Sequence, residues 1–398
     1  MGIYCPFIFE KIKFFGDLFI NLLKLFALPL ICSTLIVALG NLKGSLSRLK
    51  SMATKMVGYM LLSELMAVLI ALILFNTLEP GVGGNSNLIL GGESQVALTH
   101  HDFKFANFIL SIFPDNIFYS LTHFELLPVV IFSILFGLGA AFVGEASKPF
   151  LQLAGSIRDI SSKCLSGVMV LAPIGIFVLV GYGIAQSHLS GSLQVNFMAL
   201  LRFVGVLFLG LFLHGLWQLI LASIASKQKI LDILRQSLPV FYMAFGTSSS
   251  VATLPVAMHA VEGLKANSFA TRFMLPLSAS INLGGMIMYE MAAVFFFSQI
   301  LGLDLSLSQQ ILLAIACILG SMAGGGIPET SMVTLALVFK IVNIPLSAIS
   351  VLLPFDRIVD RARTVLNIFG NMCGVIVVSQ LIREPKEQDE VLNTELAK

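Results

Sequence analysis

The chain is poor in charge and has no paired cysteines, and both shortages exclude classes of protein. Charged residues make up 12% of the 398 residues, against about 25% in soluble globular domains. The net charge of +2 at neutral pH is too small to favour nucleic acid as a partner. The cysteines stand alone, without CxxC or another paired spacing, which argues against a disulfide framework or a zinc site.

Hydrophobic residues are abundant instead, at 57% of the chain. A soluble domain of this length could not bury so much apolar surface, whereas a lipid bilayer accepts it. Apolar runs of spanning length occur at about 17–40, 54–77, 123–144, 165–187 and 195–226, and the later segments 236–262, 269–302, 308–344 and 346–382 are apolar but interrupted by Gly, Pro, Ser and Asn. The pattern predicts an all-α polytopic protein embedded in the lipid of the plasma (inner) membrane.

Lysine and arginine gather in alternate connections between these segments. The positive-inside rule therefore places 41–55, 145–164, 227–235 and the polar tail 383–398 in the cytoplasm. The same count puts the N-terminus outside the cell.

The last apolar segment carries charges where lipid tolerates them least, in the stretch DRIVDRARTVLNIFGN. A charge at the bilayer centre costs about 2.5–3.5 kcal/mol, so such residues face the protein interior or a watery site. On a helix that turns about 100° per residue, one stripe roughly 100° wide holds Asp356, Asp360, Arg363, Thr364, Asn367 and Asn371. A salt bridge that only joins helices would not need all of these polar groups. The stripe predicts a binding site for a small charged solute.

Two other segments are too polar and glycine-rich at their centres to cross lipid as plain helices. They contain GTSSSVATLP, within 236–262, and GSMAGGGIPETSMVT, within 308–344. Helix–break–helix hairpins that dip into the membrane would suit both, because irregular backbone there lines a cavity or is buried in protein. Such broken segments are typical of a transporter's binding site, although small residues also serve close helix packing.

Two further acids lie in apolar surroundings. The segment PLSASINLGGMIMYE contains Asn282 followed by two glycines, which predicts a local unwinding, and Glu290 lies about two turns further on. Glu64 is embedded in VGYMLLSELMAVLIALILF. A lone acid in such a span pairs with a partner or holds its proton.

These motifs together resemble the dicarboxylate/amino acid:cation symporter family, the glutamate-transporter family, over about residues 10–382. TSSSVATLP resembles the family's first hairpin, GGGIPETSMVT its second, PLSASINLGGMIMYE its unwound seventh span and DRIVDRARTVLNIFGN its polar eighth span. The resemblance implies a homotrimer with an elevator mechanism. A scaffold, mainly residues 1–229, would hold a transport core, residues 230–382, made of the four interrupted segments. The family's first span has no counterpart, so we expect the chain to begin at the second span.

The resemblance assigns substrate contacts residue by residue. Asp360 matches the carboxylate that holds the α-ammonium group of the substrate, and Arg363 matches the guanidinium that binds a side-chain carboxylate with its planar fork. The other matched contacts are Thr364, Asn367, Ser249 and Ser250 of the first hairpin, and the backbone of Gly326 and Ile327 in the second. The implied function is uptake of an acidic amino acid, L-glutamate or L-aspartate. The alternatives are a sodium-coupled symporter of C4-dicarboxylates or neutral amino acids and, more remotely, a channel.

The residues that bind ions in the family are changed here. The seventh-span signature NMDGT reads NLGGM at Asn282–Met286, and Asn371 stands where the eighth span has an acid. Two carboxylates that normally face Na⁺ are therefore replaced. A sodium site would consist of Asn282, Asn367 and Asn371.

Three acids remain as candidates for ion coupling. Glu290 matches a proton-linked or potassium-linked glutamate of some members, Glu64 lies where the third span contributes a hydroxyl to a sodium site, and Asp356 belongs to the polar stripe. We therefore expect coupling to protons, alone or with fewer sodium ions, and no cofactor besides the coupling ions.

An enzyme is the alternative from a different functional class. Ser249 or Ser250 could serve as a nucleophile in a membrane-embedded hydrolase. The sequence has no GxSxG or HExxH motif, and the nearest histidine, His259, lies nine residues after Ser250. The sequence therefore predicts a carrier rather than an enzyme.

Overall fold

The computed structural model describes residues 6–382 with the exception of 41–42, 85–112, 114, 124–125, 190–192, 265 and 324–330. The described part is helical, without β-strands, as predicted. Helical stretches long and apolar enough to cross a membrane are Thr54–Leu78, Ile131–Cys164, Val195–Ser226, Met274–Leu301 and Val351–Leu381. The outer faces of α2 (Lys43–Leu78) and α9 (Leu193–Ser226) carry large apolar side chains, among them Leu65, Phe212 and Ile224. Such faces suit contact with lipid rather than water.

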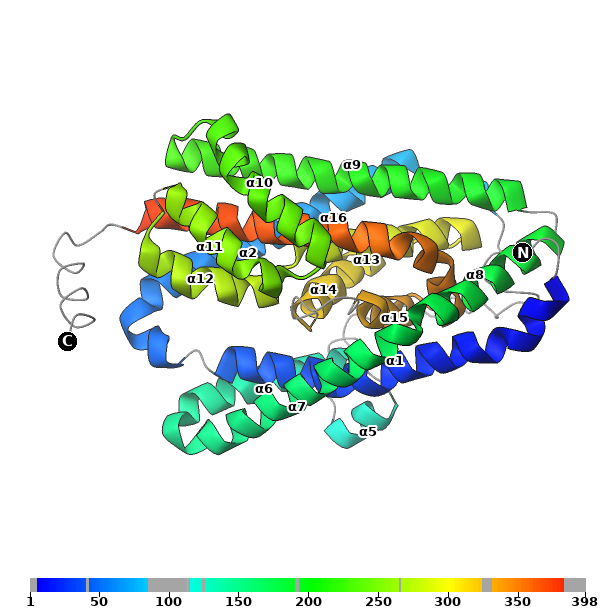
Figure 1. Ribbon diagram of the computed structural model, residues 1–398, viewed down its shortest axis with the longest axis horizontal. Helices are drawn as coiled ribbons and strands as arrows, with labels where there is room; N and C mark the ends of the chain where they lie inside the picture. Colours follow the sequence, from blue (N-terminus) through cyan, green and yellow to red (C-terminus); the bar gives the residue numbers. More distant parts are fainter. Residues whose placement is uncertain are drawn as a thin grey trace.

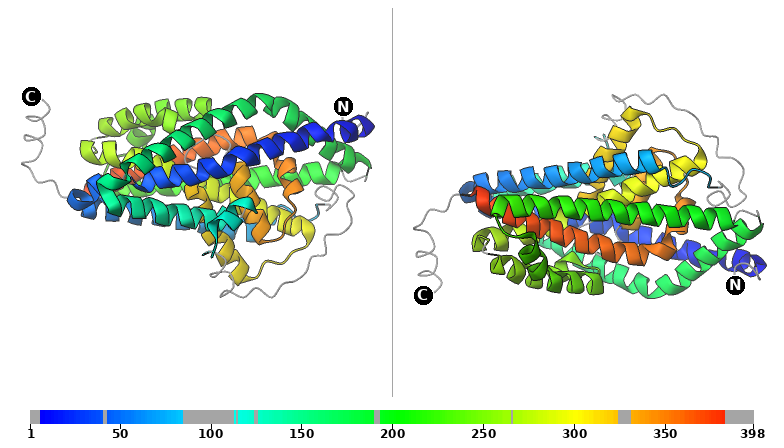
Figure 2. Two further views of the ribbon diagram at one scale, coloured as in Figure 1. Left: turned by 90° about the horizontal axis from the view of Figure 1, so that it is seen from below. Right: turned by 90° about the horizontal axis from the view of Figure 1, so that it is seen from above.

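One group of helices packs around the first helix (Figures 1 and 2). It consists of α1 (Pro6–Gly40), α6 (Leu126–Val143), α7 (Lys148–Val168) and α8 (Ala172–Leu189), with the short α5 (Ile117–Thr122) beside α6. Glycines let α8 approach α1 closely, because a Cβ at Gly175 or Gly181 would overlap the rings of Phe19 or Phe9. The segment 145–164, predicted as a connection, is mostly the helix α7, which packs along α1.

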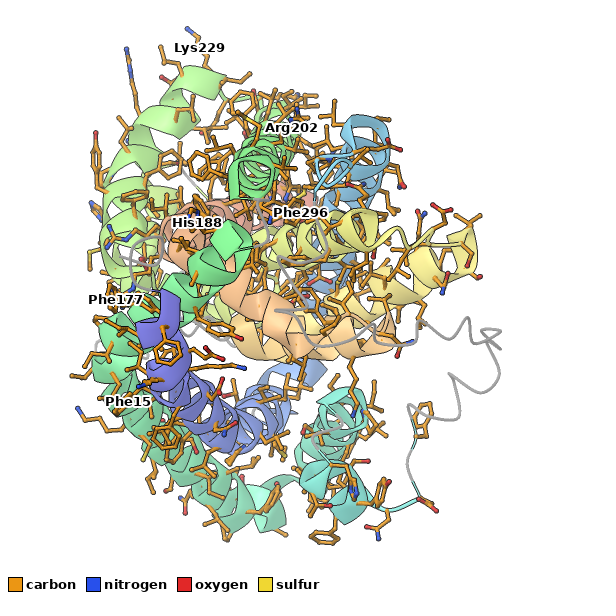
Figure 3. All side chains as sticks on the ribbon, turned by 90° about the vertical axis from the view of Figure 1, so that its right-hand side faces the viewer. Phe15, Phe177, His188, Arg202, Lys229 and Phe296 are labelled. Carbon is orange, nitrogen blue, oxygen red and sulfur yellow. The ribbon has the colours of Figure 1, made fainter. Side chains whose placement is uncertain are left out.

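A second group surrounds α16 (Ile349–Leu381), which packs against α2 (Lys43–Leu78), α9 (Leu193–Ser226) and α13 (Gly284–Leu301). The helix α13 lies at the centre of the bundle, and its residues from Gly284 to Ser298 are all buried. Figure 3, a view along the bundle, shows Phe296 of α13 among the helices, and Phe15 and Phe177 on the side formed by α1 and α8. A helix buried on all sides is apolar all round, which explains why α13 also reads as a membrane span.

The first polar-centred segment forms two helices with a break between them. Helix α10 (Ile230–Thr247) ends at Ser248, whose φ of 51° lies in the left-handed region, and α11 (Ser250–Gly263) begins after Ser249. The hydroxyl of Ser249 accepts a hydrogen bond from the Ala252 amide at 3.2 Å and so caps α11. Both helices pack against α16. The predicted interruption is confirmed, and its insertion into a membrane stays a prediction.

The predicted unwinding at Asn282 is also confirmed. Helix α12 (Ser268–Ile281) ends there, and α13 begins at Gly284. The second polar-centred segment lies between α14 (Leu307–Ala323) and α15 (Ser331–Ile341), and a 3₁₀ turn (Leu346–Ala348) leads into α16. Gly326, Ile327 and the tail 383–398 lie outside the described residues.

Candidate functional site: a buried charged cluster beside a broken helix

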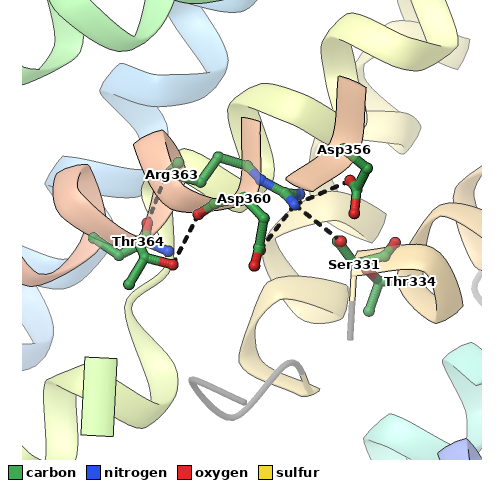
Figure 4. A network of polar contacts seen from close by, with 8 residues as sticks. Ser331, Thr334, Asp356, Asp360, Arg363 and Thr364 are labelled. Atoms are coloured by element: carbon green, nitrogen blue, oxygen red, sulfur yellow. Dashed lines mark hydrogen bonds and ion pairs between the residues drawn. The ribbon is translucent and has the colours of Figure 1, made fainter. Parts of the chain in front are cut away.

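Arg363 is the centre of a charged cluster on α16 (Figure 4). The side chain is only 3% exposed, and its Nη2 atom donates to Asp360 Oδ1 at 3.0 Å and to Asp356 Oδ1 at 3.2 Å. It also donates to the Ser331 hydroxyl at 3.1 Å, at the start of α15. Spacings of three and seven residues place all three charges on one helix face. The helical stripe predicted from the sequence thus faces the protein interior.

The cluster keeps unused hydrogen-bond donors. Arg363 Nε and Nη1 are buried and have no partner among the described residues. The guanidinium carbon lies 4.1 Å from the centre of the Tyr289 ring, a cation–π contact that orients the group. Unpaired buried donors are costly, so these two nitrogens are available to an anion. Two carboxylates against one guanidinium also leave one negative charge for a cation.

Of the other predicted substrate contacts, Thr364 adjoins the Arg363 cluster, whereas Ser249 and Ser250 lie at a different helix break. Thr364 is buried, and its hydroxyl donates to the Asp360 backbone oxygen at 2.8 Å (Figure 4). Ser249 and Ser250 lie at the break between α10 and α11, and Ser250 is buried. Within the described part of the chain, no hydrogen bond joins either serine to the Arg363 cluster. The hydroxyl of Ser331 was not predicted.

The predicted sodium residues come together where the broken helix meets α16. Asn282 Nδ2 donates to Asn371 Oδ1 at 2.8 Å, and the Gly285 amide donates to Asn367 Oδ1 at 2.8 Å. A Cβ at Gly285 would lie 3.0 Å from that oxygen and 3.1 Å from the Arg363 backbone oxygen, so the glycine permits the close approach. Asn282 Oδ1 has no partner among the described residues. A cation could therefore bind to this oxygen without breaking a hydrogen bond.

Both acids predicted from the apolar spans are buried. Glu290 on α13 is fully enclosed, with the Thr334 hydroxyl and the Cys317 thiol facing its carboxyl group. Glu64 on α2 is 2% exposed, and its Oε1 atom has no partner among the described residues. Neither forms an ion pair within the described part of the chain. Both stay candidates for carrying a proton.

Sequence reasoning missed a polar group on α9. His214 and Gln218 are both buried and reach Ser63 on α2. The available signal was a histidine and a glutamine four residues apart in an apolar span, which places them on one helix face. Ser63 precedes Glu64, so this group lies directly beside a predicted acid in the sequence.

A charged cluster inside an apolar helical bundle, next to a helix broken at its polar centre, defines a membrane transporter for a charged solute. The sequence matches the model of the family described as "Sodium:dicarboxylate symporter family" over residues 1–381. The chain belongs to this family and is an integral membrane transporter rather than an enzyme. The resemblance recognised in the sequence is confirmed.

Curated relatives cover most of the chain. It is 30% identical to the "Proton/sodium-glutamate symport protein" of Geobacillus stearothermophilus, over 92% of this chain and 86% of the relative. It is 30% identical to the "Proton/glutamate-aspartate symporter" of Escherichia coli (strain K12), over 92% and 84%. It is 29% identical to "C4-dicarboxylate transport protein 2" of Mesorhizobium japonicum, over 96% and 86%.

Proposed function

We propose that this chain is a secondary active transporter that takes up an acidic amino acid, L-glutamate or L-aspartate, together with protons, sodium ions or both. The observation that carries the proposal is Arg363, whose buried Nε and Nη1 atoms are unpaired while Asp360 lies 3.0 Å from Nη2. An acidic amino acid complements both groups. Its side-chain carboxylate would bind the unpaired nitrogens, and its ammonium group would bind Asp360.

C4-dicarboxylates are the second candidate, because one of the relatives carries that name. A second carboxylate on the ligand would meet Asp360, and like charges repel strongly at a buried site. A neutral amino acid would leave the buried Arg363 nitrogens without their anion. The pair of groups therefore favours a ligand with one ammonium group and two carboxylates.

The coupling ions in the names of the glutamate-transporting relatives are protons and sodium. In this chain Glu290 and Glu64 are buried carboxyl groups, while Asn282, Asn367 and Asn371 supply neutral groups at the helix break. Nearby negative charge strengthens the binding of a sodium ion to oxygen ligands, and the side chains described at the break, those of Asn282, Asn367 and Asn371, are neutral. We propose proton coupling, alone or with fewer sodium ions.

We further propose a homotrimer in which a transport core slides against a scaffold. The boundary predicted at residue 229 assigns α2 and α9 to the scaffold. However, both helices pack against α13 and α16 of the core, which supports a core that includes α2 and α9. Helices α6, α7 and α8 pack around α1, and these four helices would form the scaffold. The sliding surface would lie where α8 meets α16 and α6 meets α14.

The test is uptake of radiolabelled L-glutamate and L-aspartate into proteoliposomes, with sodium and proton gradients imposed separately. Saturable uptake that L-aspartate inhibits, and succinate and L-alanine do not, supports the proposal. Accumulation of labelled substrate by counterflow distinguishes a carrier from a channel. Inhibition by succinate without transport of either amino acid would contradict the acidic amino-acid assignment and favour the dicarboxylate candidate.

A further inference from the structure

His214 lies where α9 passes the break between α12 and α13. Its imidazole is fully buried, and a Cβ added at Gly284 would lie 2.6 Å from its Cε1 atom. Non-bonded carbon atoms prefer separations of about 3.5–4.0 Å. The imidazole of His214, on α9, therefore fills the space that a side chain at position 284 would need.

Ser63 on α2 holds the imidazole in place, and Gln218 on α9 supports this contact. His214 Nε2 lies 3.1 Å from the Ser63 backbone oxygen, and because a carbonyl group only accepts, Nε2 carries the hydrogen. Gln218, one turn along α9, donates from Nε2 to the Ser63 hydroxyl at 3.2 Å. A Cβ at Gly370 would overlap the Gln218 amide, so this side chain is also packed tightly against α16. His214 cannot move aside without breaking these contacts.

The break and its neighbours on α9 are rich in unused acceptors. With the hydrogen on Nε2, His214 Nδ1 is a bare acceptor, and it has no partner among the described residues. Asn282 Oδ1 is also buried without a partner in that part of the chain. Buried acceptors without donors are costly. Neutral acceptors of this kind suit a small cation that enters with its own charge.

We propose that His214 is a positioning residue for the coupling cation. Held by Ser63, it takes the space of a side chain at Gly284 and keeps the helix break in a form that binds the cation through neutral groups. The residue thereby sets the ion dependence of transport without touching the substrate cluster around Arg363. This inference rests on the proposed function, because it assumes that a cation binds at the break.

The contact between His214 and Gly284 is tested without transport, by thermal unfolding of the purified protein. Gly284→Ala should lower Tm, because the added methyl group overlaps a fixed imidazole. His214→Ala should lower Tm by removing the contacts to Ser63. The double variant should lose clearly less than the sum of the two single losses, since the smaller side chain makes room for the methyl group. Additive losses would overturn the proposed contact.

The role in coupling is tested by the sodium and proton dependence of glutamate uptake. His214→Ala should shift the ion concentration for half-maximal uptake by about tenfold, the loss of one buried polar contact, while substrate exchange at saturating ion persists. His214→Gln can still donate to the Ser63 carbonyl, so its ion concentration for half-maximal uptake should stay close to that of the unmodified protein. The control is His259→Gln, on the exposed face of α11, which should match the unmodified protein. Should His214→Ala fail to fold, His214→Asn replaces it.

A folded His214→Ala or His214→Asn variant with the ion dependence of the unmodified protein would overturn the proposal. A failure of the proposed function looks different, because the unmodified protein itself would then show no ion-driven uptake of an acidic amino acid. The thermal comparison still reports on the contact in that case.

Discussion

The Arg363 cluster and the helix break between α12 and α13 both involve residues of α16, yet they differ in charge. Around Arg363 the chain keeps a guanidinium and two aspartates, joined by contacts of 3.0 and 3.2 Å. At the break, neutral side-chain amides form the hydrogen bond instead, from Asn282 Nδ2 to Asn371 Oδ1 at 2.8 Å. The cluster carries the charges that the proposed substrate requires, whereas the break carries neutral groups where the family resemblance implies acids.

Under the proposed function, recognition of the substrate and coupling to the ion would be separable in this fold. A buried arginine without a carboxylate partner is strongly destabilising, so Arg363 depends on its ion pairs with Asp356 and Asp360. An amide pair satisfies itself without an ion, because each amide has a donor and an acceptor. The break can therefore keep its hydrogen bonds without any charge, whereas the cluster depends on its ion pairs. The predictions below test the two regions separately.

The largest effect is expected at the cluster, for Arg363→Cys. The variant loses the two nitrogens proposed to bind the side-chain carboxylate. Hydrogen bonds to charged groups are worth about 1.5–3 kcal/mol each, so glutamate affinity should fall by about 150-fold or more. Preference should shift toward neutral amino acids, measured by competition in the uptake assay.

The matched control is Arg357→Cys, on the exposed face of the same helix. Because breaking a buried ion pair costs about 3–5 kcal/mol, both variants are first compared by size-exclusion chromatography and thermal unfolding. An Arg363→Cys protein that folds and keeps glutamate affinity would show that this arginine does not bind the substrate.

Asp360→Asn should weaken amino-acid binding about tenfold to 150-fold, the worth of one charge-assisted hydrogen bond of about 1.5–3 kcal/mol. The introduced amide oxygen could still accept from Arg363, so the fold should persist. Binding is measured by calorimetry or by exchange at saturating ion, with Asp304→Asn in an exposed loop as the control. Unchanged affinity with intact protein would assign Asp360 a structural role as a partner of Arg363.

Much of this comparison could be predicted from the sequence because charge and backbone interruptions are local signals. Asp356, Asp360 and Arg363 share a helical face by spacing alone, and Asn282 before two glycines marks a break. The contact between His214 and Gly284 could not be predicted in this way. It joins residues 70 positions apart on different helices, and only the packing of α9 against α13 brings them together.

The proposed division into a moving core and a fixed scaffold shows the same limit. Hydropathy marks the apolar segments and their order along the chain, but the helices that each segment packs against depend on tertiary packing. Helix α2 follows α1 in the chain and packs with α9, α13 and α16. A boundary drawn along the sequence therefore separates helices that pack together.

Glu290→Gln should remove the proton component of coupling. An inward gradient of one pH unit corresponds to about 1.4 kcal/mol and thus about tenfold accumulation for each coupled proton. In sodium-free vesicles the unmodified protein should reach this accumulation and the variant should not, while exchange continues because Gln fills the same space. Glu64→Gln is measured in parallel, and Glu262→Gln on the exposed face of α11 is the control. Accumulation that depends strictly on external sodium, with both Gln variants active, would contradict proton coupling.

The smallest effect is expected from restoring a charge at the break, with Asn371→Asp. Asn371 Nδ2 has no partner among the described residues, so its loss breaks no bond, and the introduced carboxylate could still accept from Asn282 Nδ2. This carboxylate would be buried without a counter-charge, and a sodium ion would relieve it. Sodium at about ten times its Kd stabilises the folded state by about 1.4 kcal/mol, which raises Tm by a few degrees. The unmodified protein and the exposed Asn343→Asp variant should show a smaller rise. An equal sodium-dependent rise in Tm for all three proteins would contradict this prediction. It would show that the added carboxylate does not strengthen sodium binding at the break.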